Sequence, residues 1–159
     1  MRRVAGARER AVSWPWVAAA VCMVILIWGN SLVPGEGSSG ISLAVVDAVQ
    51  RFLHGLGLPW EWVTNFLVRK TAHFTEYAAL GMLVSQAGDP QGSHVRLRFP
   101  VIALVLVCVP CVDEAIQLFV SGRSGQLADV LLDCCGALTG VALRCAAVAR
   151  ARGRRRDRA

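Results

Sequence analysis

Four long apolar stretches, separated by polar segments, dominate the hydropathy pattern of this 159-residue chain. They run from Trp14 to Val33, from about Val68 to Gly88, from Phe99 to Val120 and from Leu127 to Ala149. About 20 helical residues are needed to cross the roughly 30 Å hydrocarbon core of a bilayer, and each stretch is long enough to do so. The pattern predicts an all-α membrane protein with four transmembrane helices.

The first stretch contains no formally charged residue and follows basic residues, as the apolar part of a signal peptide would. It is long for such a region and lacks a clear small-residue cleavage site, so we expect an uncleaved first helix. The other three stretches contain ionisable residues, and hydropathy therefore defines their ends less sharply.

The first loop, residues 34–67, begins with the glycine- and serine-rich segment Gly35–Gly40, which we expect to be flexible. Apolar positions at helical spacing follow on one face: Val45, Val49, Phe52, Leu53 and Leu56. They predict a short amphipathic helix in this first extracytoplasmic loop. It would lie on the outer interface with Trp60 and Trp62 as anchors, or pack as a lid on the bundle.

The distribution of charge predicts the orientation. Hydrophobic residues make up 55% of the chain and charged residues 18%, against about 25% charged in a soluble domain. Thirteen Lys and Arg residues fall in the N-terminal segment, the second loop and the tail from Arg144, and four fall on the other side. The positive-inside rule then places both termini in the cytoplasm. We expect a basic N-terminus at residues 1–13, a membrane domain at residues 14–149 and an Arg-rich tail at residues 150–159.

The net charge of +6 does not indicate a nucleic-acid partner, because the basic tail directly follows an apolar segment. Basic residues beside a membrane span attract anionic lipid head groups and help to set topology, so membrane lipids are the expected partners. All six cysteines lie inside apolar segments, which favours packing over redox or metal-binding roles. The sequence gives no indication of the oligomeric state.

Polar residues gather at one predicted depth, the outer end of the bundle. The second helix contributes Lys70, His73, Glu76 and Tyr77, and the third helix contributes Asp113, Glu114 and Gln117. The loop before the fourth helix contributes Arg123, and the fourth helix contributes Asp129 and Asp133. On the fourth helix, the two aspartates share a face with Gly136 and Gly140, where glycines allow a neighbouring backbone to approach closely. We therefore expect the acidic face to point into the bundle.

These groups are candidates for chemistry, because an ionisable residue at mid-helix costs about 2.5–3.5 kcal/mol on insertion scales. The cluster's five carboxylates need cations, protons, water or a metal ion. The catalytic candidates are His73, Glu76, Asp113 and Glu114, and the substrate-binding candidates are Lys70, Tyr77, Gln117, Arg123, Asp129 and Asp133. A divalent metal (Mg²⁺, Mn²⁺ or Zn²⁺) is one compensating cofactor, although the spacing matches no specific ligand motif. The alternative is a set of ion pairs that only clamps the helices.

Three segments of the chain resemble motifs of VanZ-like membrane proteins. Residues 69–81 (RKTAHFTEYAALG) resemble the signature of that family, Asp113–Gln117 with Arg123 resembles its second motif, and Asp129–Asp133 with Gly136 and Gly140 resembles its last helix. The resemblance covers about residues 14–143. Asp133 is a departure, because the pattern has Asn at that position.

The resemblance implies a four-helix protein of the bacterial plasma membrane. The family's name-giving member confers low-level resistance to teicoplanin-type lipoglycopeptides by reducing their binding at the cell surface. We therefore expect a cell-envelope protein that reduces lipoglycopeptide access through its outward-opening polar site. The alternative is an enzyme that acts on a lipid-linked cell-wall precursor. Proton-coupled transport through the carboxylates ranks third, because four helices make a thin transporter.

Overall fold

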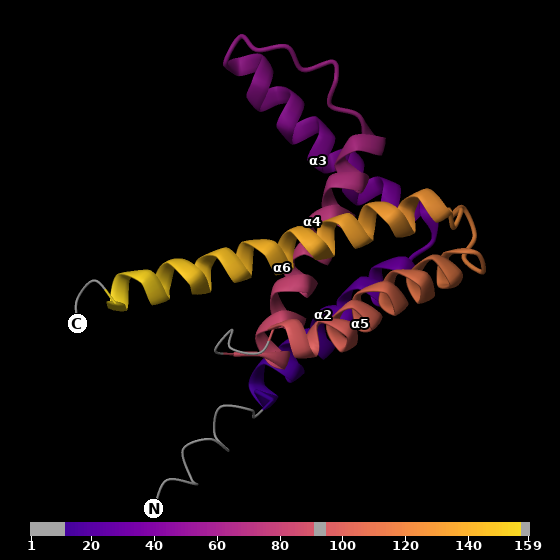
Figure 1. Ribbon diagram of the computed structural model, residues 1–159. Coiled ribbons are helices and arrows are strands. Elements are labelled where there is room, and N and C mark those ends of the chain that lie inside the picture. The colour runs from indigo at the N-terminus through magenta and orange to yellow at the C-terminus, as the bar shows by residue number, and fades with distance from the viewer. Residues whose placement is uncertain (1–11, 91–94, 157–159) are drawn as a thin grey trace, which may run out of the picture.

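The structure, a computed structural model, describes residues 12–90 and 95–156, without the side chains of residues 36, 38, 39, 95–97 and 156. The described residues form five helices: α2 (Trp14–Ser31), α3 (Gly35–Gly55), α4 (Asn65–Gly88), α5 (Val95–Gln117) and α6 (Leu127–Arg156). The all-α prediction is confirmed (Figure 1). The predicted basic N-terminus lies outside the described residues, apart from Val12 and Ser13.

Local sequence signals account for the helix ends and for one irregularity. Pro15 stands in the first turn of α2, where its missing N–H costs no helical hydrogen bond. Thr64 caps α4, since its hydroxyl accepts a hydrogen bond of 3.2 Å from the backbone N–H three residues on. Pro110 inside α5 leaves the carbonyl of Leu106 without its helical donor. The thiol of Cys134 on α6 lies 3.9 Å from that carbonyl and contributes a weak replacement.

Among the described residues, three helices are long and apolar enough to cross a membrane: α2, residues 98–117 of α5 and residues 127–155 of α6. Apolar side chains such as Ile25, Leu104 and Leu143 are more than half exposed, as expected of faces that contact lipid. α4 has sufficient length but carries several ionisable residues in its first half. The structure supports a multi-pass membrane protein, and a fourth crossing by α4 stays a prediction.

The backbones of α4 and α6 touch where these helices cross (Figure 1). A Cβ atom at Gly136 or Gly140 would lie 2.5 or 1.8 Å from a backbone oxygen of α4, and a Cβ atom at Gly81 would lie 2.1 Å from a backbone oxygen of α6. No side chain fits at such distances. The glycine face predicted for the fourth helix is the packing face, and Gly81 is its counterpart on α4.

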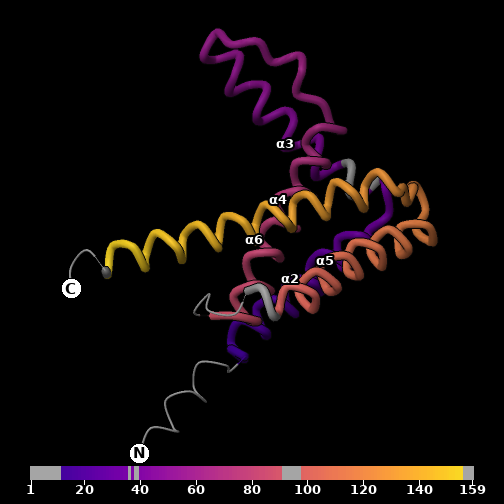
Figure 2. Tube along the Cα trace, viewed as in Figure 1, coloured from indigo at the N-terminus to yellow at the C-terminus, as the bar shows by residue number. Residues whose placement is uncertain are grey.

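α2 and α5 lie side by side next to α4, with α2 drawn in indigo and α5 in salmon (Figures 1 and 2). The core contains side chains from α2, α4, α5 and α6, and Ile27, Tyr77, Leu80 and Ala137 are completely buried. Successive long helices run in opposite directions (Figure 2). The C-terminal ends of α2 and α5, the start of α6 and the first half of α4 therefore meet at one end of the bundle.

The first loop differs from its prediction. α3 begins at Gly35, so Gly35–Gly40 is helical and the expectation of flexibility is wrong. At 21 residues α3 is also not short. A hydrogen bond of 3.0 Å from the Gly35 backbone N to the Ser121 carbonyl attaches its start to the turn after α5. The rest of α3 projects away from the bundle (Figures 1 and 2), and its position relative to a membrane stays a prediction.

Several helix ends also differ from the hydropathy pattern, among them the C-terminal ends of α5 and α6. α5 ends at Gln117, three residues before the predicted Val120, because the chain turns towards α6 at this point. α6 continues to Arg156, so most of the predicted Arg-rich tail is helical. Arg144, which the charge count assigned to the cytoplasmic segment, is buried and donates to the side chain of Gln86 at 2.9 Å and to the carbonyl of Asp89.

Candidate functional site

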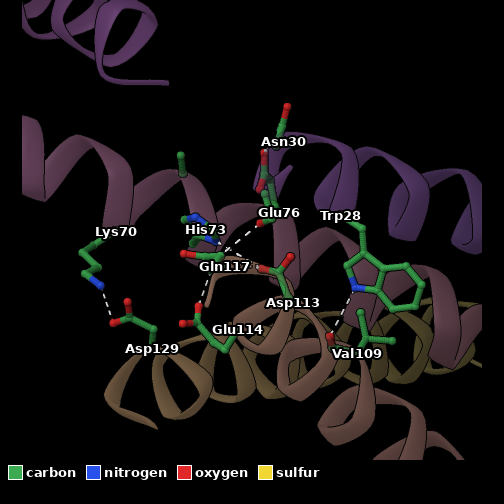
Figure 3. A network of polar contacts seen from close by, with 12 residues as sticks. Trp28, Asn30, Lys70, His73, Glu76, Val109, Asp113, Glu114, Gln117 and Asp129 are labelled. Carbon is green, nitrogen blue, oxygen red and sulfur yellow. Dashed lines mark hydrogen bonds and ion pairs between the residues drawn. The ribbon is translucent and has the colours of Figure 1, made fainter. Parts of the chain in front are cut away.

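The ten candidate residues come from four segments that meet at one end of the bundle, most of them visible in Figure 3. The first half of α4 contributes four residues, the last two turns of α5 contribute three, and the start of α6 contributes two. Arg123 comes from the turn between α5 and α6. The antiparallel arrangement of the helices explains why positions so far apart in sequence converge here.

His73, Asp113 and Asp133, one from each of α4, α5 and α6, form the centre of this cluster. Each residue presents one nitrogen or carboxylate oxygen, and these three atoms lie within 4.8 Å of one another. The Nδ1 atom of His73 is 4.0 Å from Oδ2 of Asp113. Asp113 is 0% exposed and Asp133 is 1% exposed. One oxygen of Asp113, both oxygens of Asp133 and Nδ1 of His73 are buried without a hydrogen-bond partner.

Lys70 and Asp129 form an ion pair at the edge of the cluster (Figure 3). Their side chains are 25% and 19% exposed. The ammonium group also lies 5.3 Å from the ring centre of Phe66, a cation–π distance. Because Lys70 is already paired with Asp129, it does not form a direct ion pair with the buried Asp113 and Asp133.

Glu114 and Gln117 are held in a network that is part of the packing. The amide nitrogen of Gln117 donates to Glu114 Oε1 at 3.0 Å, to Ser31 Oγ at 3.4 Å and to Asp113 Oδ2 at 3.5 Å. The other oxygen of Glu114 accepts a hydrogen bond of 2.8 Å from the backbone N of Gln126. Gln126 directly precedes α6, so Glu114 satisfies a backbone donor at that helix start and places negative charge there. This contact gives Glu114 a structural role.

Glu76 does not join the central group, whereas the buried side chain of Tyr77 lies near Asp113. Glu76 accepts a hydrogen bond of 3.1 Å from the Asn30 side chain and lines a separate cavity of about 220 Å³ between α2, α3 and α4. Tyr77 is fully buried and its hydroxyl has no hydrogen-bond partner. Neither residue lines the larger polar cavity described next.

A cavity of about 260 Å³ opens beside the central cluster. Its wall combines acids with basic and amide groups, among them Arg69, Lys70, His73, Glu114, Gln117, Arg123, Asp129 and Asp133. Arg69, His73 and Arg123 also line the cavity that contains Glu76, so these three side chains separate the two spaces.

Arg123 links the end of α2 to the rim of this cavity. Its guanidinium donates to the carbonyls of Asn30 at 2.7 Å and Val33 at 3.0 Å, at and just beyond the end of α2. Burial lowers the pKa of this guanidinium from its ordinary value, and the positive charge of Arg69 lowers it further. The negative charges of Asp113, Glu114 and Glu76 act in the opposite direction. Within the described part of the chain, neither arginine forms an ion pair with a carboxylate.

The candidate residues predicted from the sequence omit several that the structure brings to the site. Arg69 directly precedes the candidate Lys70, and this position is the sequence signal that could identify it. Asn30 and Ser31 are polar residues that end an otherwise apolar helix, and such a change at a helix end is a usable signal. Gln126 contributes through its backbone, which the pattern of side chains cannot show.

Comparison with known proteins gives one match. Neither the curated proteins nor the solved structures that were compared match the chain. The sequence model of the VanZ/LLP1 family matches residues 16–148, which include all ten candidate residues of the cluster. A match over this much of the chain establishes its family: the protein is a member of the VanZ/LLP1 family.

Proposed function

We propose that this protein binds the phosphate-bearing head group of a lipid-linked wall precursor and thereby lowers the access of teicoplanin-type lipoglycopeptides. In this proposal α4 forms the fourth crossing of the bacterial plasma membrane, both termini are cytoplasmic and the polar cavity opens outward. Membership of the VanZ/LLP1 family supports an envelope role. The excess of basic residues in the N-terminal segment, second loop and tail supports the orientation.

The observation that carries this proposal is the pair of arginines that lines the 260 Å³ cavity. Arg69 and Arg123 lie close enough for one to affect the pKa of the other, and neither has a carboxylate partner in the described structure. Arginine side chains bind phosphate through paired N–H donors, and a phosphate between two guanidinium groups would relieve their repulsion.

The surroundings of the cavity fit an amphiphile. Phe66 lines the cavity and is 71% exposed, while Leu118 and Phe119 in the neighbouring turn are 67% and 90% exposed. Such large apolar side chains at the end of a bundle are expected to contact acyl chains. A lipid can therefore place its charged head group between the arginines while its chain stays in the bilayer.

Arg69→Gln tests this proposal most cleanly, because no hydrogen bond to another residue depends on the Arg69 guanidinium in the described structure. Full-length protein in nanodiscs would be titrated with undecaprenyl phosphate and with uncharged undecaprenol. We expect selective binding of the phosphate and a loss of at least about tenfold in Arg69→Gln, the size of one charge-assisted contact. Arg51→Gln, which removes an exposed arginine of α3, is the matched control. Equal affinity for both lipids would refute the proposal.

The link to resistance requires a cellular assay. Wild type, Arg69→Gln and Arg51→Gln would be expressed at equal membrane levels in a susceptible Gram-positive host. We expect wild type and Arg51→Gln to reduce surface binding of a fluorescent teicoplanin derivative, and Arg69→Gln to lose this effect. If cells expressing each of the three proteins bound less of the teicoplanin derivative, resistance would not depend on the arginine pair.

A second candidate function, an enzyme acting on the same lipid class, is favoured by the position of His73 on the cavity wall. An imidazole there can serve as a general base if a bound substrate lies within hydrogen-bond reach. The assay is incubation of purified protein with undecaprenyl-linked precursors, followed by mass spectrometry of the lipids. Turnover that His73→Ala abolishes would establish catalysis, and intact lipids would leave the binding role.

A further inference from the structure

We propose that His73, Asp113 and Asp133 form a binding site for one divalent transition-metal ion, Mn²⁺ or Zn²⁺, at the junction of α4, α5 and α6. This site is distinct from the arginine pair, and the inference does not depend on lipid binding. It rests on the convergence of three ligand-type side chains and on the unpaired state of their buried atoms.

The first argument is electrostatic. Asp113 and Asp133 are almost completely buried and neighbour each other, while Lys70 is engaged by Asp129. Two adjacent buried carboxylates must be compensated by protons, water or a cation, because neither lipid nor packed side chains stabilise an unpaired anion. A single divalent cation balances both carboxylates, and a neutral His73 then completes the ligand set without adding charge.

The second argument concerns the unpaired atoms. The orphaned atoms are three carboxylate oxygens and the Nδ1 atom of His73, and both kinds of atom serve as metal ligands. A helix clamp would pair such atoms with donors, as Gln117 does for Glu114 at 3.0 Å and as Lys70 does for Asp129. The central three side chains lack such donors for these atoms, so a structural clamp does not explain them.

The third argument concerns distance and ligand type. Ligand atoms bound to an ion at about 2.0–2.2 Å lie about 3–4 Å apart. The His73–Asp113 separation of 4.0 Å is at the edge of this range, and the whole set lies within 4.8 Å. Small side-chain movements thus suffice to bind an ion. One imidazole with two carboxylates fits Mn²⁺ or Zn²⁺, whereas Ca²⁺ requires six to eight oxygen ligands.

Three protein ligands leave at least one coordination position free, as in metal sites that also bind water or substrate. His73 and Asp133 line the 260 Å³ cavity, so the free position is accessible from this space. The site thereby differs from a closed structural site, whose four positions are all taken by protein.

The test uses full-length protein in detergent, stripped with EDTA, desalted and titrated with MnCl₂. We expect about one Mn²⁺ per chain and ¹⁴N modulation in pulsed EPR, which reports a directly bound imidazole. His73→Ala should lose the nitrogen signal, and Asp133→Asn, which keeps the shape of the side chain, should weaken binding at least tenfold. Asp47→Asn is the matched control, with the same change at an exposed aspartate of α3, and should retain wild-type binding.

Size-exclusion elution and circular dichroism would establish that each variant is folded, and the nitrogen signal of the wild type decides the question even if His73→Ala fails to fold. Absence of stoichiometric Mn²⁺ and of stoichiometric Zn²⁺ in wild type would overturn the proposal. Equal affinity in Asp133→Asn and Asp47→Asn would also overturn it. Because the metal titration contains no lipid, a failure to bind metal is separate from a failure to bind undecaprenyl phosphate.

Discussion

Replacing Gly140 with alanine should separate α4 from α6. The added Cβ atom would lie 1.8 Å from the carbonyl oxygen of Ala78, whereas real contacts essentially never fall below 3.0 Å. The two backbones must therefore move apart by about 1 Å, and no flexible side chain can yield instead. Overpacking of this kind costs about 1–3 kcal/mol, and a backbone obstacle favours the upper end. The gain in helix propensity from Gly to Ala, about 1 kcal/mol, offsets only part of it.

We expect a net loss of about 1–2 kcal/mol, which lowers the midpoint of thermal unfolding by about 2–8 °C in a chain of this size. Fluorescence-detected size-exclusion chromatography of heated, detergent-solubilised protein measures this midpoint. Gly29→Ala is the control, because no atom lies within 4 Å of the added Cβ on α2. It should match or slightly exceed wild type. Equal midpoints for Gly140→Ala and wild type would refute the close contact between the two backbones.

Three further substitutions test individual contacts. Lys70→Met should destabilise the protein by about 1–3 kcal/mol, because Asp129 loses its cation, and a second change, Asp129→Leu, should recover most of that loss in a double-mutant cycle. Arg123→Lys should lower the unfolding midpoint by about 2–4 °C, nearly as much as Arg123→Gln. The reason is that one ammonium group does not reproduce the forked contact of the guanidinium with two carbonyls. A wild-type midpoint in Arg123→Lys would contradict this. Arg51→Gln should leave the midpoint at pH 7 unchanged, since its pair with Asp47 is exposed. Its guanidinium lowers the pKa of Asp47, so any contribution is present above about pH 4 and is lost as pH falls through the lowered pKa; a midpoint difference from wild type that grows below about pH 4 would refute this.

The sequence predicts the helices and the convergence of the polar cluster for a simple physical reason. Apolar runs of membrane-spanning length must alternate in direction when short turns connect them, so polar groups at alternate ends come to the same depth. Helical spacing of three and four residues then predicts that Asp129, Asp133, Gly136 and Gly140 share a face. The close contacts at both glycines show that this face packs against α4.

Other features depend on tertiary contacts that periodicity does not contain. Glu76 is a catalytic candidate from its position in the sequence, yet its carboxylate accepts a hydrogen bond from Asn30 of α2 and lines the second cavity. Arg144 was counted as an orientation charge, although its guanidinium binds the end of α4. α3 was expected to begin only after a flexible segment, but the contact of Gly35 with the turn after α5 supports a helix start there. In each case a partner distant in sequence decides the outcome.

The location of the central three residues follows from how the helices pack. Gly136 lies one turn of α6 from Asp133, and its carbonyl contact, at Phe74, lies next to His73 on α4. The glycine contact therefore holds α4 and α6 close together where two of the three ligand-type side chains lie. Asp113 comes from α5, which is attached through the hydrogen bonds of Gln117 and the weaker contact of the Cys134 thiol with the Leu106 carbonyl. Metal binding would add a bond between α5 and this rigid pair, so an ion at this position should stabilise the packing of α5 more than that of α4 or α6.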